Sequence, residues 1–249
     1  RLVQLPLAVF GVATAAAILP TLSAQAARRD TEGMRESLMQ GLRQTVFFVV
    51  PAALGLIVLG RPIVWLLFER GHFVSEDTYR TATALAYYAG GLVSFSLVKV
   101  AVSAFYAMKD TKTPVLVSSL SMILNIVLNC LLVRPLGYRG LALATTISFT
   151  VNFVALYVLA GDRLGKLWSS DLLTALIRIL VASAIAVASA YGAYVQLLGR
   201  FETDTIWARL VCVGGPILLA SAMYLIVCAA LDVRELRSIT AIFRRPATE

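Results

Sequence analysis

Seven long apolar runs, each about as long as a membrane is thick, dominate this chain of 249 residues. A helix needs roughly 20 mostly apolar residues to cross a hydrocarbon core of about 30 Å. Helices satisfy their backbone hydrogen bonds within such a run, whereas open strands in lipid cannot. The sequence therefore predicts an all-α integral membrane protein, a bundle of about seven transmembrane helices. The predicted spans are residues 3–24, 45–67, 80–107, 113–133, 139–160, 172–197 and 205–231.

Basic residues lie in short clusters between these runs. The formal net charge is +8, but interrupted clusters are typical of cytoplasmic loops rather than of nucleic-acid surfaces, so we expect no nucleic acid among the partners. When alternate connections are assigned to opposite sides of the membrane, twelve Lys and Arg residues fall on one side and seven on the other. The positive-inside rule then places the C-terminus in the cytoplasm and residue 1 outside.

Two segments outside the spans carry apolar residues at helical spacing beside arginines. In the first, Met34, Leu38 and Leu42 recur every four residues between the first two spans. The second is the basic tail at residues 232–249, which we separate from the seven-helix lobe at residues 1–231. Both patterns are typical of a helix lying on the cytoplasmic membrane surface, and a solvated loop is the alternative for each. The apolar residues of the tail are Val233, Leu236, Ile239 and Ile242.

Three cations stand at or inside the predicted spans, where a charge costs at least a few kcal/mol and needs a partner, a cavity or a substrate. Lys99 is flanked by Val98 and Val100, so no carboxylate lies beside it in the sequence. We interpret Lys99 as a cation that faces a cavity, with snorkelling to the membrane interface as the alternative. Arg178 is closer to an interface, which favours snorkelling, and Arg1 could be a flanking anchor.

Carboxylates, by contrast, are missing from the interior of every predicted span. An exporter that exchanges protons for cationic drugs usually needs a buried carboxylate. Buried cations without buried acids instead suit an anionic substrate such as a phosphate or pyrophosphate. The single histidine, His72, lies in a predicted loop, and no nucleophile triad or acidic pair for Mg²⁺ is visible. We therefore expect a transporter rather than an enzyme.

Asn125, Asn129 and Asn152 add polar groups inside two of the predicted spans. Asn125 and Asn129 are four residues apart, so they share one face of a helix. Hydrogen bonding between helices is the ordinary role of such residues. The alternative is an oxygen site for a small cation, which Thr145 on the next predicted helix would complete.

Three stretches, in order along the chain, resemble the MurJ (MviN) family of lipid II flippases. They read "RLVQLPLAVFGVATAAAILPTLS", "LFERGHF" and "YAMKDTKTPV". This family belongs to the exporter superfamily (MOP) that includes the MATE proteins and the polysaccharide flippases, whose members have two lobes around a central cavity. By this resemblance the chain is the C-terminal lobe and lacks its N-terminal lobe. The resemblance also implies the bacterial cytoplasmic (inner) membrane as its location and membrane lipids as its surroundings.

The resemblance implies a substrate and two residues that contact it. The substrate would be lipid II, an undecaprenyl-pyrophosphate-linked disaccharide-pentapeptide, flipped from the inner to the outer leaflet by alternating access. Arg1 stands where an arginine of the family lines the cavity, and Lys99 matches a lysine that recurs in relatives. Gln4 stands where some relatives carry an acid. The alternatives are an exporter of another polyprenyl-linked glycan or of a drug, and a scaffold of cell-wall synthesis that transports nothing.

The resemblance also implies a sodium site and a lipid groove. One relative holds sodium between three helices, and Asn125, Asn129 and Thr145 fall at matching positions. Asn129 replaces an acidic ligand there. Coupling to sodium is therefore an expectation, with no other cofactor implied. The last two predicted spans would form an apolar groove for the lipid tail.

Overall fold

A computed structural model describes residues 2–167, 170–200 and 205–236 of the chain. Within this part of the chain, seven helices are long and apolar enough to cross a membrane, and no residue lies in a strand. The predicted fold class is confirmed. The helical segments are α1 (Gln4–Pro6), a π-helical turn η1 (Leu7–Val12), α2 (Ala13–Ala27), α3 (Thr31–Val58), α4 (Gly60–Phe68), α5 (Ser75–Ala107), α6 (Lys112–Leu136), α7 (Tyr138–Leu164), α8 (Ser170–Leu198) and α9 (Ile206–Ala230).

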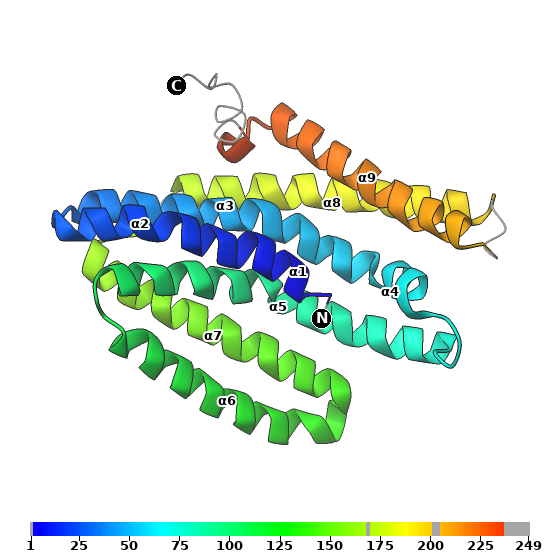
Figure 1. The fold of residues 1–249 in the computed structure, drawn as a ribbon, viewed down its shortest axis with the longest axis horizontal. Coiled ribbons are helices and arrows are strands. Elements are labelled where there is room, and N and C mark those ends of the chain that lie inside the picture. Colours follow the sequence, from blue (N-terminus) through cyan, green and yellow to red (C-terminus); the bar gives the residue numbers. More distant parts are fainter. Residues whose placement is uncertain (1, 168–169, 201–204, 237–249) are drawn as a thin grey trace.

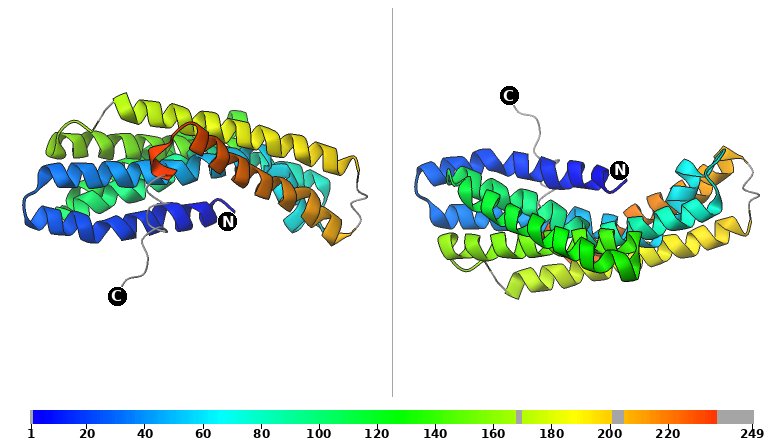
Figure 2. Two further views of the ribbon diagram at one scale, coloured as in Figure 1. Left: turned by 90° about the horizontal axis from the view of Figure 1, so that it is seen from above. Right: turned by 90° about the horizontal axis from the view of Figure 1, so that it is seen from below.

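The helices pack side by side in an order that partly follows the sequence (Figure 1). Helix α6 packs on α7, α7 on α5, α5 on α3, α3 on α8, and α8 on α9. The N-terminal segment α1–α2 lies against both α3 and α5, on one side of this array, as the views from above and below show (Figure 2). Short α4 joins α3 to α5 and also contacts α9.

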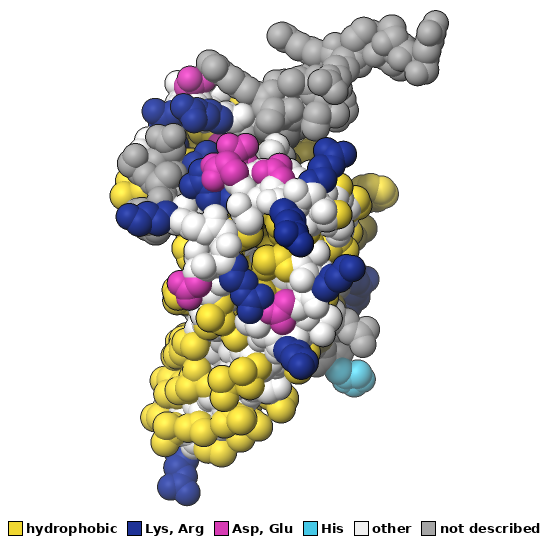
Figure 3. Space-filling model, turned by 90° about the vertical axis from the view of Figure 1, so that its left-hand side faces the viewer, with side chains coloured by type: hydrophobic (Ala, Val, Ile, Leu, Met, Phe, Trp, Pro, Cys, Tyr) yellow, Lys and Arg dark blue, Asp and Glu magenta, His cyan; other side chains and the backbone are white. Residues whose placement is uncertain are grey.

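One end of the bundle, which we call the basic end, is formed by residues 28–30, 108–111, 165–167 and 231–236. Figure 3 looks onto this end and shows Lys and Arg side chains gathered around a few Asp and Glu. Several helices stop here in left-handed turns, at Arg29, Lys109 and Asp232, each with φ between 52° and 59°. Such turns satisfy carbonyls at the last turn of a helix, as when the Asp110 N–H donates to the Phe105 carbonyl at 2.9 Å.

The prediction for residues 34–42 was wrong. Helix α3 begins at Thr31 and runs unbroken through the membrane, and Met34, Leu38 and Leu42 are 3%, 0% and 5% exposed in the main core. An apolar stripe looks the same in sequence whether it faces lipid or neighbouring helices, and here the helices of the main core cover it. The second span also ends early, at Val58, because Pro62 has no N–H to donate to the Val58 carbonyl.

The main core lies between the middle helices and includes Phe47 and Phe105, both almost fully buried. Residues that begin the tail join it: Val233 is 2% exposed and Leu236 packs against the same cluster. Ile239 and Ile242 lie outside the described residues, so a surface helix in the tail stays a prediction.

Candidate substrate groove and cation site

A groove of about 780 Å³ runs between η1, α2, α5, α6 and α7. Helix α6 packs chiefly on α7, which leaves a gap between α6 and the side of α2 and α5. Serines and asparagines line much of this groove beside apolar residues. Its polar lining residues are Lys99, Ser103, Tyr106, Ser118, Ser119, Ser121, Asn125, Thr145, Ser148 and Asn152.

The side chain of Lys99 lines this groove. It is exposed, although Val98 and Val100 on either side of it are buried in the core. Ser103 and Tyr106 share its helix face at four and seven positions further on, and both line the same groove. Lys99 is the one charged side chain among the described residues that line the groove. It lies eight residues from the end of α5, roughly 12 Å along the helix axis.

The residues proposed for a cation lie together between α6 and α7. The Asn125 amide donates to the Thr145 hydroxyl at 3.4 Å, and the Asn129 amide donates to the Asn125 side-chain oxygen at 3.0 Å. The Thr145 hydroxyl donates to the Leu141 carbonyl at 2.9 Å. The Asn129 side-chain oxygen is buried and has no hydrogen-bond partner among the described residues. Hydrogen bonds thus link the three residues, and the unsatisfied Asn129 oxygen is of the kind that suits a hard cation.

Asn152 forms a second polar contact in the groove. Its amide donates to the Ser118 hydroxyl at 3.4 Å, and its side-chain oxygen is buried without a partner in the described part of the chain. Polar residues within a membrane tie helices together, so this pair joins α7 to α6.

An apolar cavity of about 430 Å³ lies on the other side of the bundle, between η1, α3, α8 and α9. Phe10 and Phe48 stack there with ring centroids 4.9 Å apart. Ala186 and Ile217 line it from the last two spans, which supply its outer walls. The cavity lies where the resemblance implies a groove for the lipid tail.

Of the other cations singled out in the sequence, the structure describes only Arg178, and it does not line the groove. Arg1 is outside the described residues, and Gln4 is exposed as the first residue of α1. Arg178 donates to the Asp232 carbonyl at 3.3 Å, so its guanidinium reaches the basic end as the snorkelling alternative expects.

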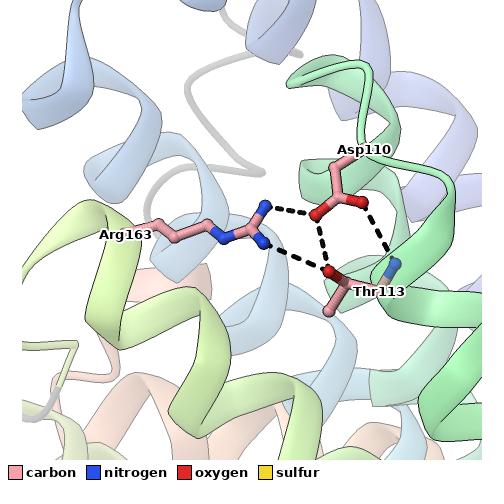
Figure 4. A network of polar contacts seen from close by, with 3 residues as sticks. All are labelled: Asp110, Thr113 and Arg163. Carbon is pink, nitrogen blue, oxygen red and sulfur yellow. Dashed lines mark hydrogen bonds and ion pairs between the residues drawn. The ribbon is translucent and has the colours of Figure 1, made fainter.

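A polar network at the basic end was missed by the sequence analysis (Figure 4). The Thr113 hydroxyl donates to Asp110 at 2.6 Å and its N–H at 3.0 Å, and Arg163 on α7 pairs with the same carboxylate. These Thr113 contacts, followed by Arg163, lower the pKa of Asp110 to about 2. An Asp three residues before a helical N–H is a capping pattern, so half of this network could have been found.

Comparisons with known proteins agree with the fold. The family described as lipid II flippase MurJ matches residues 1–211. A relative from Vibrio cholerae named "Probable lipid II flippase MurJ" is 36% identical over 237 residues, which are 94% of this chain and 44% of the relative. A relative of the same name from Haemophilus influenzae is 33% identical over 241 residues, 94% of this chain and 47% of the relative.

A solved structure gives the same result in three dimensions. It is titled "Lipid II flippase MurJ, inward closed conformation" and superposes with a TM-score of 0.74 at 27% identity. The match covers 94% of this chain and 45% of that one. The chain spans less than half the length of these curated relatives. Because the family matches most of the chain, from the first helix into the last, the chain belongs to the MurJ family of lipid II flippases.

Proposed function

We propose that the complete protein, meaning this chain with whatever its gene encodes beside it, moves lipid II across the bacterial cytoplasmic membrane by alternating access. This chain supplies the C-terminal lobe, and an N-terminal lobe closes the central cavity. The protein acts as a transporter and makes or breaks no covalent bond. The basic end faces the cytoplasm, because the positive-inside rule assigns the richer cluster of Lys and Arg to that side.

The groove with Lys99 carries this proposal. Its described lining contains a cation and many hydroxyl and amide groups but no carboxylate. An anionic pyrophosphate bears oxygens that accept hydrogen bonds from all of these groups, and a lysine binds it as a point charge. A cationic drug would meet repulsion from Lys99 and no countercharge from the groove.

Sodium coupling is a second part of the proposal. Asn125, Asn129 and Thr145 offer oxygens to Na⁺ from α6 and α7, and the unsatisfied Asn129 oxygen supports this role. The residues lie beside the groove, which Asn125 and Thr145 line directly. A bound ion would fix the position of α6 relative to α7 and so favour one state of the transport cycle.

The experiment measures arrival of lipid II at the outer leaflet in cells depleted of their own flippase. The complete protein is expressed at matched membrane abundance as the wild type, Lys99→Gln, Lys99→Arg and Arg1→Ala. Lys112→Gln is the matched control, because Lys112 is exposed at the basic end and does not line the groove. We expect Lys99→Gln to lower delivery about tenfold, since a hydrogen bond to a charged group contributes about 1.5 kcal/mol or more.

The outcomes separate the alternatives. Lys99→Arg should restore part of the delivery, because it keeps the charge. If Lys99→Gln and Arg1→Ala both deliver lipid II as the wild type does, these cations do not bind the substrate; if the wild type delivers nothing, the protein is a scaffold. If the wild type delivers no lipid II but moves another polyprenyl-linked glycan or a drug, it is a different exporter of the same superfamily.

A further inference from the structure

A second anion-binding region lies at the basic end, outside the groove. A pocket of about 490 Å³ is lined there by four cations, Arg35, Arg43, Lys166 and Arg234, and by two carboxylates, Glu36 and Glu235. A smaller adjoining pocket shares Arg43 and Arg234 and adds Arg178. The region therefore carries an excess of positive charge at the basic end of the bundle.

Arg35 shows how this pocket is built. It donates to the Lys166 carbonyl at 3.0 Å and pairs with Glu32, which fixes the guanidinium across the start of α3 and the end of α7. Its Nε is buried and has no hydrogen-bond partner among the described residues. Leaving a buried guanidinium N–H without an acceptor costs free energy. An anionic oxygen of a ligand would supply that acceptor.

An apolar cleft of about 350 Å³ opens beside the basic pocket, deeper in the bundle. Its walls come from α3, α5, α7 and α8, with Leu97, Phe153 and Ile179 among the lining residues. Helix α3 contacts both α7 and α8, so the cleft lies over α3. Val154 in its wall is 52% exposed, which places the opening on the surface of the bundle.

Two residues join the cleft to the charged pocket. Arg43 lines the cleft and both basic pockets, so one side chain borders the charged and the apolar space. Tyr157 lines the cleft from α7, and its hydroxyl is buried without a hydrogen-bond partner in the described part of the chain. From the end of α7 into the bundle, the site therefore presents first the cations of the basic pocket, then the Tyr157 hydroxyl and last the apolar cleft.

We propose that this composite site binds an anionic phospholipid of the leaflet at the basic end. The phosphate lies among Arg35, Arg43 and Lys166. The Tyr157 hydroxyl donates to an ester oxygen of the glycerol backbone, and one acyl chain fills the cleft between α7 and α8. Basic pockets between transmembrane helices at a membrane surface are suited to such headgroups.

The cleft has room for an acyl chain. It shares no lining residue with the groove at Lys99 or with the apolar cavity at α9. This site is therefore separate from the proposed transport route and does not rest on it. The bound lipid would join α8 to α7, two helices that otherwise meet mainly through α3.

The test uses the complete protein in neutral detergent and measures binding of phosphatidylglycerol by native mass spectrometry. Phosphatidylcholine tests the need for negative charge, and glycerol 3-phosphate and inorganic phosphate test the need for an acyl chain. Lys166→Gln removes a cation, Tyr157→Phe removes only the hydroxyl, and Ala175→Leu fills the cleft, which Ala175 lines. Lys112→Gln is the control, since Lys112 is exposed at the same end and lines neither pocket nor cleft.

We expect phosphatidylglycerol to bind more tightly than phosphatidylcholine. A cation near a membrane surface contributes about a fivefold gain in affinity for anionic lipid, so Lys166→Gln should lose about that much. Tyr157→Phe and Ala175→Leu should lower the affinity for phosphatidylglycerol and leave the binding of soluble phosphate unchanged. Lys112→Gln should bind the lipid as the wild type does. Because Tyr157→Phe keeps the charge and shape of the site, it tests the proposal even if a charge variant folds poorly.

Two results would overturn the proposal. If glycerol 3-phosphate or inorganic phosphate binds as tightly as phosphatidylglycerol, and Ala175→Leu changes nothing, the pocket takes a soluble anion. If phosphatidylcholine binds equally well, or Lys112→Gln weakens binding as much as Lys166→Gln, the attraction is unspecific and no site exists.

Discussion

The hydroxyl of Tyr224 in α9 donates a 2.6 Å hydrogen bond to the backbone carbonyl of Phe47 in α3. Pro51, four residues after Phe47, has no N–H, so this carbonyl lacks its usual donor within the helix. Both partners are buried, and an unpaired polar group within a membrane is costly. Tyr224 therefore fastens the α8–α9 pair to the central helix at a position that a proline has opened.

This relationship predicts a specific double-mutant cycle. Tyr224→Phe should lower the free energy of unfolding by about 1 to 3 kcal/mol, because it leaves the Phe47 carbonyl unpaired. In a Pro51→Ala background the helix regains an N–H at residue 51, and the same substitution should cost clearly less. Thermal unfolding of all four proteins in detergent measures the coupling. Tyr191→Phe on the exposed face of α8 is the control; strictly additive losses would contradict the account.

Asp110 gives a prediction about pH. Its pKa is lowered to about 2 by Thr113 and Arg163, below the ordinary aspartate value of about 3.9 in the unfolded chain. A lowered pKa means that the ionised carboxylate stabilises the folded state. The contribution is present in full above about pH 4 and is lost as the pH falls through about 2.

The measurement compares Asp110→Asn with the wild type by thermal unfolding across this range. At neutral pH the variant should melt at a lower temperature, because Arg163 loses its partner and α6 loses an N-terminal cap. The gap should close between about pH 4 and pH 2, where the wild-type carboxylate takes up a proton. A gap that stays constant down to pH 2 would show that the charge of Asp110 is irrelevant.

The number of spans could be predicted from sequence because each needs only local information, an apolar run of sufficient length. The beginning of α3 could not. Arg28, Arg29 and Arg35 are typical of a surface segment, whereas the stripe of Met34, Leu38 and Leu42 is buried in the main core. Which partner covers a stripe is decided by tertiary packing, and one sequence does not report it.

At the polar site, too, local sequence predicts some contacts and tertiary packing decides the others. Helical spacing predicts that Asn125 and Asn129 share a face, and Thr145 is a candidate only as a residue of the next predicted helix. The structure brings Thr145 beside them because α7 runs back along α6 after a short turn at Gly137. The contact of Tyr224 with Phe47 joins residues 177 positions apart and carries no pattern in sequence. The basic pocket was equally hidden, since its cations come from α3, the link after α7 and the start of the tail.

The site at Asn129 predicts a response to sodium. If Asn125, Asn129 and Thr145 bind Na⁺, NaCl should raise the unfolding temperature of the complete protein above its value in an equal concentration of KCl. Asn129→Ala should abolish this difference, because it removes an oxygen. Asn129→Asp should enlarge it, because a carboxylate binds a hard cation more strongly than an amide does. Equal unfolding temperatures of the wild type and Asn129→Asp in both salts would remove sodium from the proposed mechanism.

Close packing of the first span on α5 gives the last prediction. A Cβ added at Gly11 would lie 3.0 Å from both Cα and Cβ of Ser96, so one of the two helices would have to move. Gly11→Ala should therefore lower the free energy of unfolding by about 1 to 3 kcal/mol, the usual cost of overpacking. Gly90→Ala is the matched control, since a Cβ at Gly90 has no other atom within 4 Å. It should be neutral or raise the free energy of unfolding by up to about 1 kcal/mol, because alanine favours a helix. Thermal unfolding measures both effects. Equal effects at the two glycines would mean that η1 and α5 are not in close contact at Gly11 and Ser96.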